Sequence, residues 1–155
     1  MHSRAGLQLR EDCAAIVRAQ GRAESAGGAK ITSAYNLPCR YVLHTVGPRV
    51  ALRVGETERN LLKSCYLSCL DLAREKGLKS VAFCCISTGV FNFPAGEAAE
   101  IAVGTAKAMV DEACRLSHAG DLRRIYRARR GYLYRDPSID VNGVAVYGSS
   151  RPGGS

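Results

Sequence analysis

Apolar residues recur at helical spacing in three stretches of the chain, and each stretch is bounded by a residue that starts or stops a helix. The first stretch lies near the N-terminus and runs to Gly21. The second spans residues 56–76 and is followed by Gly77, and the third spans residues 95–117 behind Pro94. The pattern predicts three amphipathic helices, whose apolar faces contain Ala5, Leu9, Cys13, Ile16 and Val17, then Leu61, Cys65, Leu72 and Ala73, then Ala98, Ile101, Ala102, Thr105, Ala108 and Met109.

Short apolar runs that favour an extended backbone lie between these helices. They cover residues 30–35, 41–46 and 81–86, and the last of them is apolar on both faces. A strand that is apolar on both faces is typical of a sheet covered on both sides. The alternation of strands and helices therefore predicts a three-layer α/β/α fold.

The run at residues 81–86 stops abruptly at the small residues Ser87, Thr88 and Gly89, and a helix follows from Pro94. A strand, a small-residue loop and a helix in this order direct backbone N–H groups towards an anion. Glycine also lets a ligand come close to the backbone. The aromatic residues of the same loop can cover a sugar or a base, or they can pack under the following helix. The pattern thus predicts either a site for a nucleotide-like ligand with a diphosphate or a packed hydrophobic loop.

The eight residues from Ser87 to Pro94, STGVFNFP, resemble the phosphate loop of the macro domain family, whose members bind ADP-ribose. Other motifs in the same chain order resemble that family's middle strands and central helix; they are GAKIT at 28–32, YNLP at 35–38, YVLHTVGP at 41–48, Leu61, Cys65-Tyr66 and Leu72-Ala73. The resemblance covers about residues 2–113 and is strongest to the bacterial branch that removes ADP-ribose from proteins.

This resemblance implies a macro domain sandwich with a mixed sheet and a site for the diphosphate and distal ribose of ADP-ribose. The residues that it assigns to this site are Ser87, Thr88, Gly89, Val90, Phe91 and Asn92. The implied partner is ADP-ribose or an ADP-ribosylated protein. Two alternatives fit. In the first, the domain hydrolyses ADP-ribose from modified proteins. In the second, it does not catalyse, and it is either a reader module that only binds ADP-ribose or an inactive fragment.

The chain departs from the family at its N-terminus, because the first residues resemble the helix that follows the family's Asn-rich and Gly-rich loops. The resemblance therefore implies an N-terminally truncated domain that lacks its first strands. Those loops supply the family's catalytic groups, so the catalytic residues are unknown and we expect this chain to hydrolyse very slowly or not at all. The zinc ligands of the zinc-dependent branch lie there too, so we expect no metal in this chain, and zinc remains an option for the intact parent.

A sheet without those strands would leave backbone donors and apolar side chains exposed. We therefore expect one of three arrangements. The C-terminal tail replaces the missing strands, a partner chain supplies them, or the fold is only marginally stable.

The net charge of +8 arises largely from arginines near the C-terminus. Arginines interleaved with tyrosines can bind nucleic acid, whereas a solvated or disordered tail has the same composition. We divide the chain into a partial macro domain, residues 1–117, and a divergent arginine-rich C-terminal segment, residues 118–155. The clustered arginines are Arg123, Arg124, Arg127, Arg129, Arg130 and Arg135.

The seven cysteines include no C-x-x-C pair and are odd in number, so they indicate neither a disulfide framework nor a four-ligand zinc site. We interpret Cys65, Cys69, Cys84 and Cys85 as small core residues. His44, within a predicted strand, is interpreted as a hydrogen-bonded structural residue. No apolar run approaches the length of a membrane span and the N-terminus is charged, which predicts a cytoplasmic protein without a membrane partner.

Overall fold

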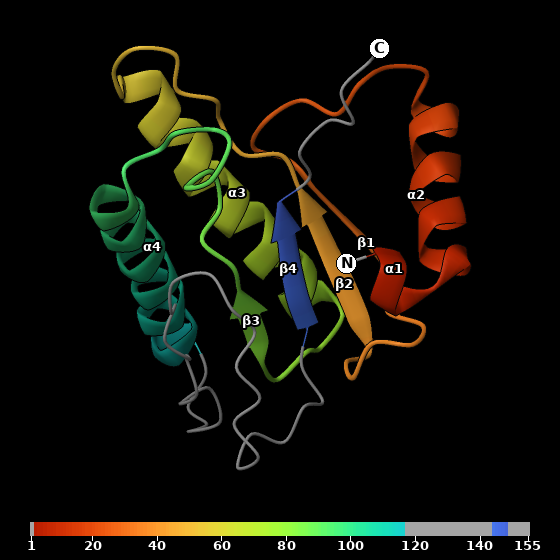
Figure 1. Ribbon diagram of the computed structural model, residues 1–155. Helices are drawn as coiled ribbons and strands as arrows, with labels where there is room; N and C mark the ends of the chain where they lie inside the picture. Colours follow the sequence, from red (N-terminus) through yellow and green to blue (C-terminus); the bar gives the residue numbers. More distant parts are fainter. Residues whose placement is uncertain (1, 117–143, 149–155) are drawn as a thin grey trace.

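The computed structural model describes residues 2–116 and 144–148, which form helices around a single mixed sheet (Figure 1). The elements in chain order are α1 His2–Ala5, α2 Leu7–Gln20, β1 Ala29–Ser33, β2 Tyr41–Thr45, α3 Glu56–Glu75, β3 Val81–Phe83, α4 Ala95–Leu116 and β4 Val144–Gly148. Among the described helices, none is long and apolar enough to cross a membrane. The predicted arginine cluster lies outside the described residues.

The sheet has the strand order β1-β2-β4-β3. β1 is antiparallel to β2, with Ile31 opposite Leu43, whereas β4 is parallel to both of its neighbours. Leu43 of β2 and Phe83 of β3 both pair with Val146 of β4. The mixed sheet expected from the sequence is therefore confirmed.

The strand β4 has an interior position in the sheet. β2 and β3 are consecutive strands, yet β4 from the C-terminal part of the chain lies between them (Figure 1). Within the described residues β3 has no other strand partner. The arginine-rich segment assigned to residues 118–155 thus contributes one strand to the domain.

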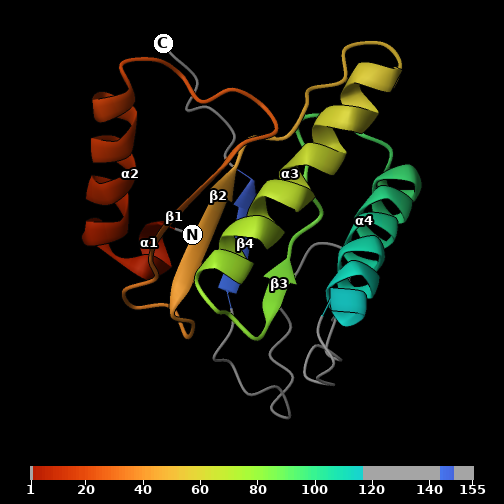
Figure 2. The same cartoon turned by 180° about the vertical axis from the view of Figure 1, so that it is seen from behind.

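One layer of helices, formed by α3 and α4, covers one face of the sheet (Figure 2). Leu43, Leu62, Cys65, Cys69 and Ile86 are almost completely buried in the core cluster on this face. Burial raises the pKa of the Cys69 thiol to about 12, so that this thiol stays protonated and unreactive. The interpretation of Cys65 and Cys69 as core residues is confirmed.

The other layer contains α2, on the opposite face of the sheet. Neighbouring residues of a strand point to opposite faces. While Leu43 packs into the α3 core, the next residue, His44, lies beside Cys13 of α2, with 4.0 Å between the cysteine Sγ and each ring nitrogen. The Cys13 sulfur is thus equally far from both ring nitrogens of His44. Leu9 of α2 and Val42 of β2 are fully buried outside the main cluster, and the three-layer arrangement follows.

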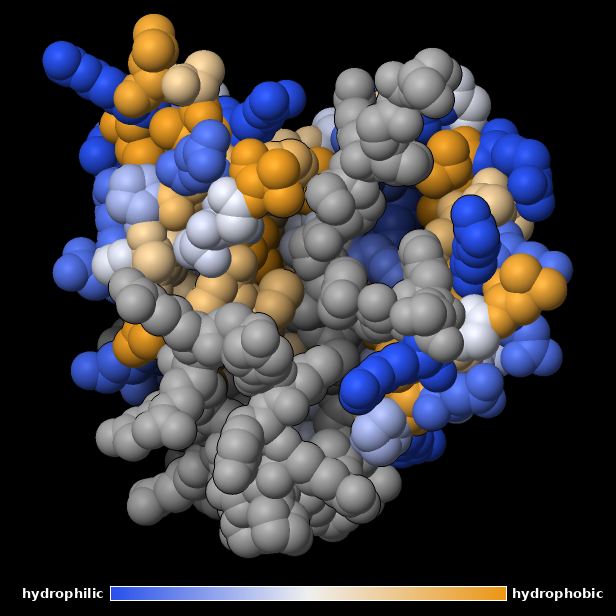
Figure 3. Space-filling view, in the orientation of Figure 1, coloured by the Kyte–Doolittle hydropathy of each residue, from blue (hydrophilic) through white to orange (hydrophobic). Residues whose placement is uncertain are grey.

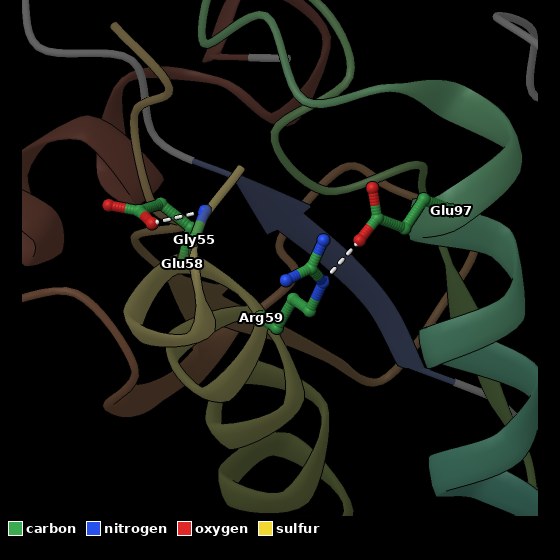
Figure 4. Close-up of polar contacts among 4 residues, drawn as sticks. All are labelled: Gly55, Glu58, Arg59 and Glu97. Carbon is green, nitrogen blue, oxygen red and sulfur yellow. Dashed lines mark hydrogen bonds and ion pairs between the residues drawn. The ribbon is translucent and has the colours of Figure 1, made fainter. Parts of the chain in front are cut away.

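Local chemistry explains where α3 begins and ends. The Glu58 carboxylate accepts a hydrogen bond of 2.8 Å from the N–H of Gly55, a donor that an uncapped helix would leave unsatisfied (Figure 4). At the other end Gly77 adopts φ of 62°, which glycine reaches without steric cost.

The strand β3 is shorter than the predicted run at residues 81–86, since the chain leaves the sheet after Phe83. Cys85 is half-buried and Cys84 is exposed. The interpretation of Cys84 as a core residue is therefore wrong, because it follows the last paired residue and no longer faces a packed layer.

Because β4 alone joins β3 to the sheet among the described strands, removing a β4 backbone donor tests the fold. Ala145 pairs with Val42 on one side and with Ala82 on the other. Ala145→Pro removes its N–H and should lower the free energy of unfolding by about 2–4 kcal/mol, measured by urea denaturation. Ala145→Ser keeps the N–H and is the matched control. Equal stability of the two variants would show that β4 does not hold the sheet together.

Candidate ligand-binding loops

Two loops that are distant in sequence meet at one edge of the sheet. β2 and β3 are both parallel to β4, so the loops that follow them leave the sheet at the same edge (Figure 1). The N–H of Val50, in the first loop, donates a 2.9 Å hydrogen bond to the carbonyl of Phe91, in the second. Ligands of open α/β sheets bind at this kind of edge.

The loop after β3 is folded tightly upon itself. The N–H of Asn92 bonds to the carbonyl of Gly89, and that of Phe93 bonds to the carbonyl of Ser87, both at 3.0 Å. Ser87 and Asn92 have φ of 64° and 56°, a left-handed conformation that is costly for residues other than glycine. Such strain is found preferentially at functional sites, where the surrounding structure enforces it.

These internal bonds leave three consecutive donors unused. The N–H groups of Gly89, Val90 and Phe91 donate to no other described residue. Gly89 and Val90 are exposed and Phe91 is half-buried. Consecutive backbone N–H groups in a loop that leads into a helix form a concave site suited to an anion.

The hydroxyl of Ser87 is a second unsatisfied polar group at the same place. Its Oγ is buried and has no hydrogen-bond partner among the described residues. Leaving a buried hydroxyl unpaired costs about 1–3 kcal/mol. A ligand that supplied an acceptor would remove this cost, which makes Ser87 a candidate ligand contact.

Gly89 has open space beside its backbone. A Cβ built on Gly89 would meet no atom within 4 Å, and its φ is not in the left-handed region. Neither packing nor backbone conformation therefore requires glycine here. The open space beside its backbone is available to a bound molecule.

The two aromatic residues of the loop have different surroundings. Phe93 is 2% exposed and belongs to the main core cluster, as the packed-loop alternative predicted. Phe91 is half-buried, and its carbonyl binds the neighbouring loop. The packed loop and the ligand site therefore coexist, with Phe93 anchoring the segment that carries the free donors.

The N-termini of α3 and α4 lie at this edge, and an ion pair joins them. Arg59 in the first turns of α3 pairs with Glu97 in the first turn of α4 (Figure 4). Both residues are partly exposed, so the pair contributes little stability of its own. Its effect is to fix the separation of two helix ends whose positive dipoles favour an anion.

His44 and the Cys13 thiol, which first suggest chemistry, lie beside each other on the α2 side of the sheet. The hydroxyl of Thr32 lies 2.8 Å from Nε2 of His44, as expected for a structural histidine. Burial, with the Asp12 carboxylate adding to it, raises the pKa of the Cys13 thiol and so disfavours a nucleophilic thiolate. No group of three or more metal-ligating side chains occurs within the described part of the chain.

The sequence analysis did not assign the loop after β2 to the site, because it assigned only the residues from Ser87 to Asn92. A Cβ on Gly47 would lie 2.7 Å from Cγ2 of Ile86 and closer still to Oγ of Ser87. The absence of a side chain at Gly47 thus lets the two loops touch. The available signal was the Gly-Pro pair directly after an apolar strand.

Comparison with known proteins agrees with this geometry. Residues 1–102 match the family model described as Macro domain, and the chain belongs to the macro domain family. It is 56% identical over 113 residues to a protein-ADP-ribose hydrolase of Staphylococcus aureus (strain MRSA252), covering 72% of this chain and 42% of the relative. It is 59% identical over 105 residues to a protein-ADP-ribose hydrolase of Treponema medium, covering 68% of this chain and 40% of the relative.

A solved structure gives the same result for the fold. The Oceanobacillus iheyensis macrodomain with ADP superposes with a TM-score of 0.68 at 30% identity, covering 96% of this chain and 65% of that chain. The three-layer macro domain fold expected from the sequence is confirmed. The chain spans about two fifths of the length of the two bacterial relatives that it matches.

The contact between Gly47 and the loop after β3 can be tested by adding one methyl group. Gly47→Ala should destabilise the domain by about 1–3 kcal/mol, because Ile86 and Ser87 must move to admit the new Cβ. Gly104→Ala is the control, since a Cβ there meets no atom within 4 Å and alanine favours a helix. Thermal unfolding of both variants is the measurement. An unchanged melting temperature for Gly47→Ala would mean that the loops are not in close contact.

Proposed function

We propose that this chain binds ADP-ribose, with the diphosphate and distal ribose held by the loop from Ser87 to Asn92. The observation that carries the proposal is the run of N–H donors at Gly89, Val90 and Phe91 beside the Ser87 hydroxyl, none of which has a hydrogen-bond partner among the described residues. These donors suit the oxygens of a diphosphate, and the exposed side of Gly89 leaves room for it. The names of the bacterial relatives support ADP-ribose as the ligand.

We further propose that the reaction served by this domain is hydrolysis of the bond between ADP-ribose and a modified protein. Water attacks at that bond, and the loop holds the nucleotide while the protein leaves. The described residues contain no side chain to which we assign the positioning of water. Non-catalytic reading of ADP-ribose is the second candidate, because the donors of the loop are sufficient for binding.

Two measurements separate these functions. Calorimetry with free ADP-ribose separates both of them from nucleic-acid binding through the arginine cluster. Release of ADP-ribose from a modified protein then separates the hydrolase from the reader. A chain that binds but does not release the nucleotide is a reader.

Gly89 gives the sharpest test of the binding site. Gly89→Glu should keep the fold, since the position is open, and should weaken ADP-ribose binding about 10- to 100-fold. The reason is that like charges a few ångströms apart at a protein surface repel by on the order of 1–4 kcal/mol. Gly104→Glu adds the same charge at another open position, in α4, and is the matched control. Unchanged calorimetric affinity for Gly89→Glu, in protein that binds ADP-ribose, would refute this assignment.

We propose that the chain holds no resident metal ion. The described residues offer no cluster of three ligands, and the thiols of Cys65 and Cys69 are buried in the apolar core. Elemental analysis of the purified chain should find much less than one zinc per molecule. A tightly held, stoichiometric zinc ion would contradict this and would require ligands outside the described residues.

A further inference from the structure

The loop after β2 presents an unusual exposed surface beside the proposed nucleotide site. Leu52 at its tip is 96% exposed, and Arg49 and Arg53 on either side are also exposed. Val90, 78% exposed, lies on the loop after β3. We call these four residues the docking face. Figure 3 shows apolar and strongly polar residues side by side over the end of the molecule where the two loops lie.

The two halves of the docking face are held together by the contacts already described. Val50, two residues before Leu52, is buried and bonds through its N–H to Phe91, the residue after Val90. The apolar tips therefore project from a fixed base. A single exposed apolar residue needs no explanation, but here two such residues lie on loops that are joined by a hydrogen bond, and one of them, Val90, has a backbone N–H that no described residue accepts.

The docking face carries two positive charges that no ion pair with a described residue neutralises. Arg49 and Arg53 form no ion pair with any described residue, and no acidic residue occurs between them. The nearby acids are partly engaged, since Glu97 pairs with Arg59 and Glu58 caps Gly55. Glu56 alone among them is exposed without a described partner.

We propose that the docking face binds an acidic segment of the polypeptide that carries the ADP-ribose. The inference rests on the proposed function, which brings a modified polypeptide to this edge of the sheet. Arg49 and Arg53 pair with carboxylates of that segment, and Leu52 and Val90 contact its aliphatic groups. A polypeptide fits better than a nucleic acid because the exposed apolar residues are aliphatic, whereas sites for single-stranded nucleic acid stack bases on aromatic side chains.

The test compares two synthetic peptides that carry ADP-ribose on the same residue. One has Asp and Glu around the modified residue, and the other has Asn and Gln. Fluorescence polarisation should show the acidic peptide binding about three- to tenfold more tightly, with the difference shrinking as ionic strength rises from about 0.05 M to about 0.5 M. Equal affinities would overturn the proposal.

The double variant Arg49→Gln/Arg53→Gln should abolish the preference for the acidic peptide while the affinity for free ADP-ribose stays unchanged. Leu52→Ser should weaken both peptides but not free ADP-ribose. The matched control is Arg74→Gln. Arg74 is an exposed arginine in the last turn of α3, whereas the loop with Arg49 and Arg53 leads into the first turn of that helix. A preference that survives in the double variant would refute the role of the arginines. Single-stranded RNA is the competing ligand. If it displaced the acidic peptide, bound more tightly than that peptide and lost its affinity in the double variant, the docking face would be a nucleic-acid site instead.

A last measurement separates this inference from the proposed function. The unmodified acidic peptide is titrated into the isotopically labelled chain and followed by nuclear magnetic resonance. Shifts confined to residues 49–53 and Val90 would support the docking face even if free ADP-ribose failed to bind, in which case only the proposed function would be lost. No shifts at these residues would overturn the docking face.

Discussion

The backbone pairing of β4 with β2 and β3 joins the two halves of this sheet. β1 and β2 form an antiparallel pair on their own, whereas among the described strands β3 reaches that pair only through β4. Main-chain hydrogen bonds, which depend little on sequence, thus decide where β3 lies. Every feature of the loop that follows β3 depends on this placement, since the loop faces its neighbour only while both strands end at the same edge.

The loop after β3 combines strain with an anchor. Ser87 and Asn92 occupy left-handed backbone conformations, and the N–H groups of Gly89, Val90 and Phe91 donate to no other described residue. Burial of Ile86 and Phe93 in the main core offsets this cost, because both side chains are almost fully removed from water. The result is a rigid, apolar base that holds polar groups ready for a ligand.

Side chains with reactive groups have mainly structural roles in the rest of the domain. The thiol of Cys65 donates to the carbonyl of Val46, and the hydroxyl of Thr45 donates to the carbonyl of Gly28, so both satisfy backbone groups near the ends of strands. Ser64 and Ser68 of α3 both donate to the carbonyl of Gly27. These bonds fix the connection between α2 and β1 against α3, which explains why polar residues occur on an otherwise apolar helix face.

The sequence alone determined three helical stretches, the three-layer class and the loop from Ser87 to Asn92, because helical periodicity, helix stops and the small-residue loop are local signals. It did not predict the break at Gly6, which divides the first stretch into α1 and α2. It also determined that Cys65 and Cys69 belong to a helix face directed at the core. The tertiary structure alone decided that β4 lies between β2 and β3, since the partners of a short strand are set by long-range pairing. It also decided that Gly47 abuts Ser87 and that Cys84 is exposed, because loop contacts and the last paired residue of a strand depend on neighbours far away in the sequence.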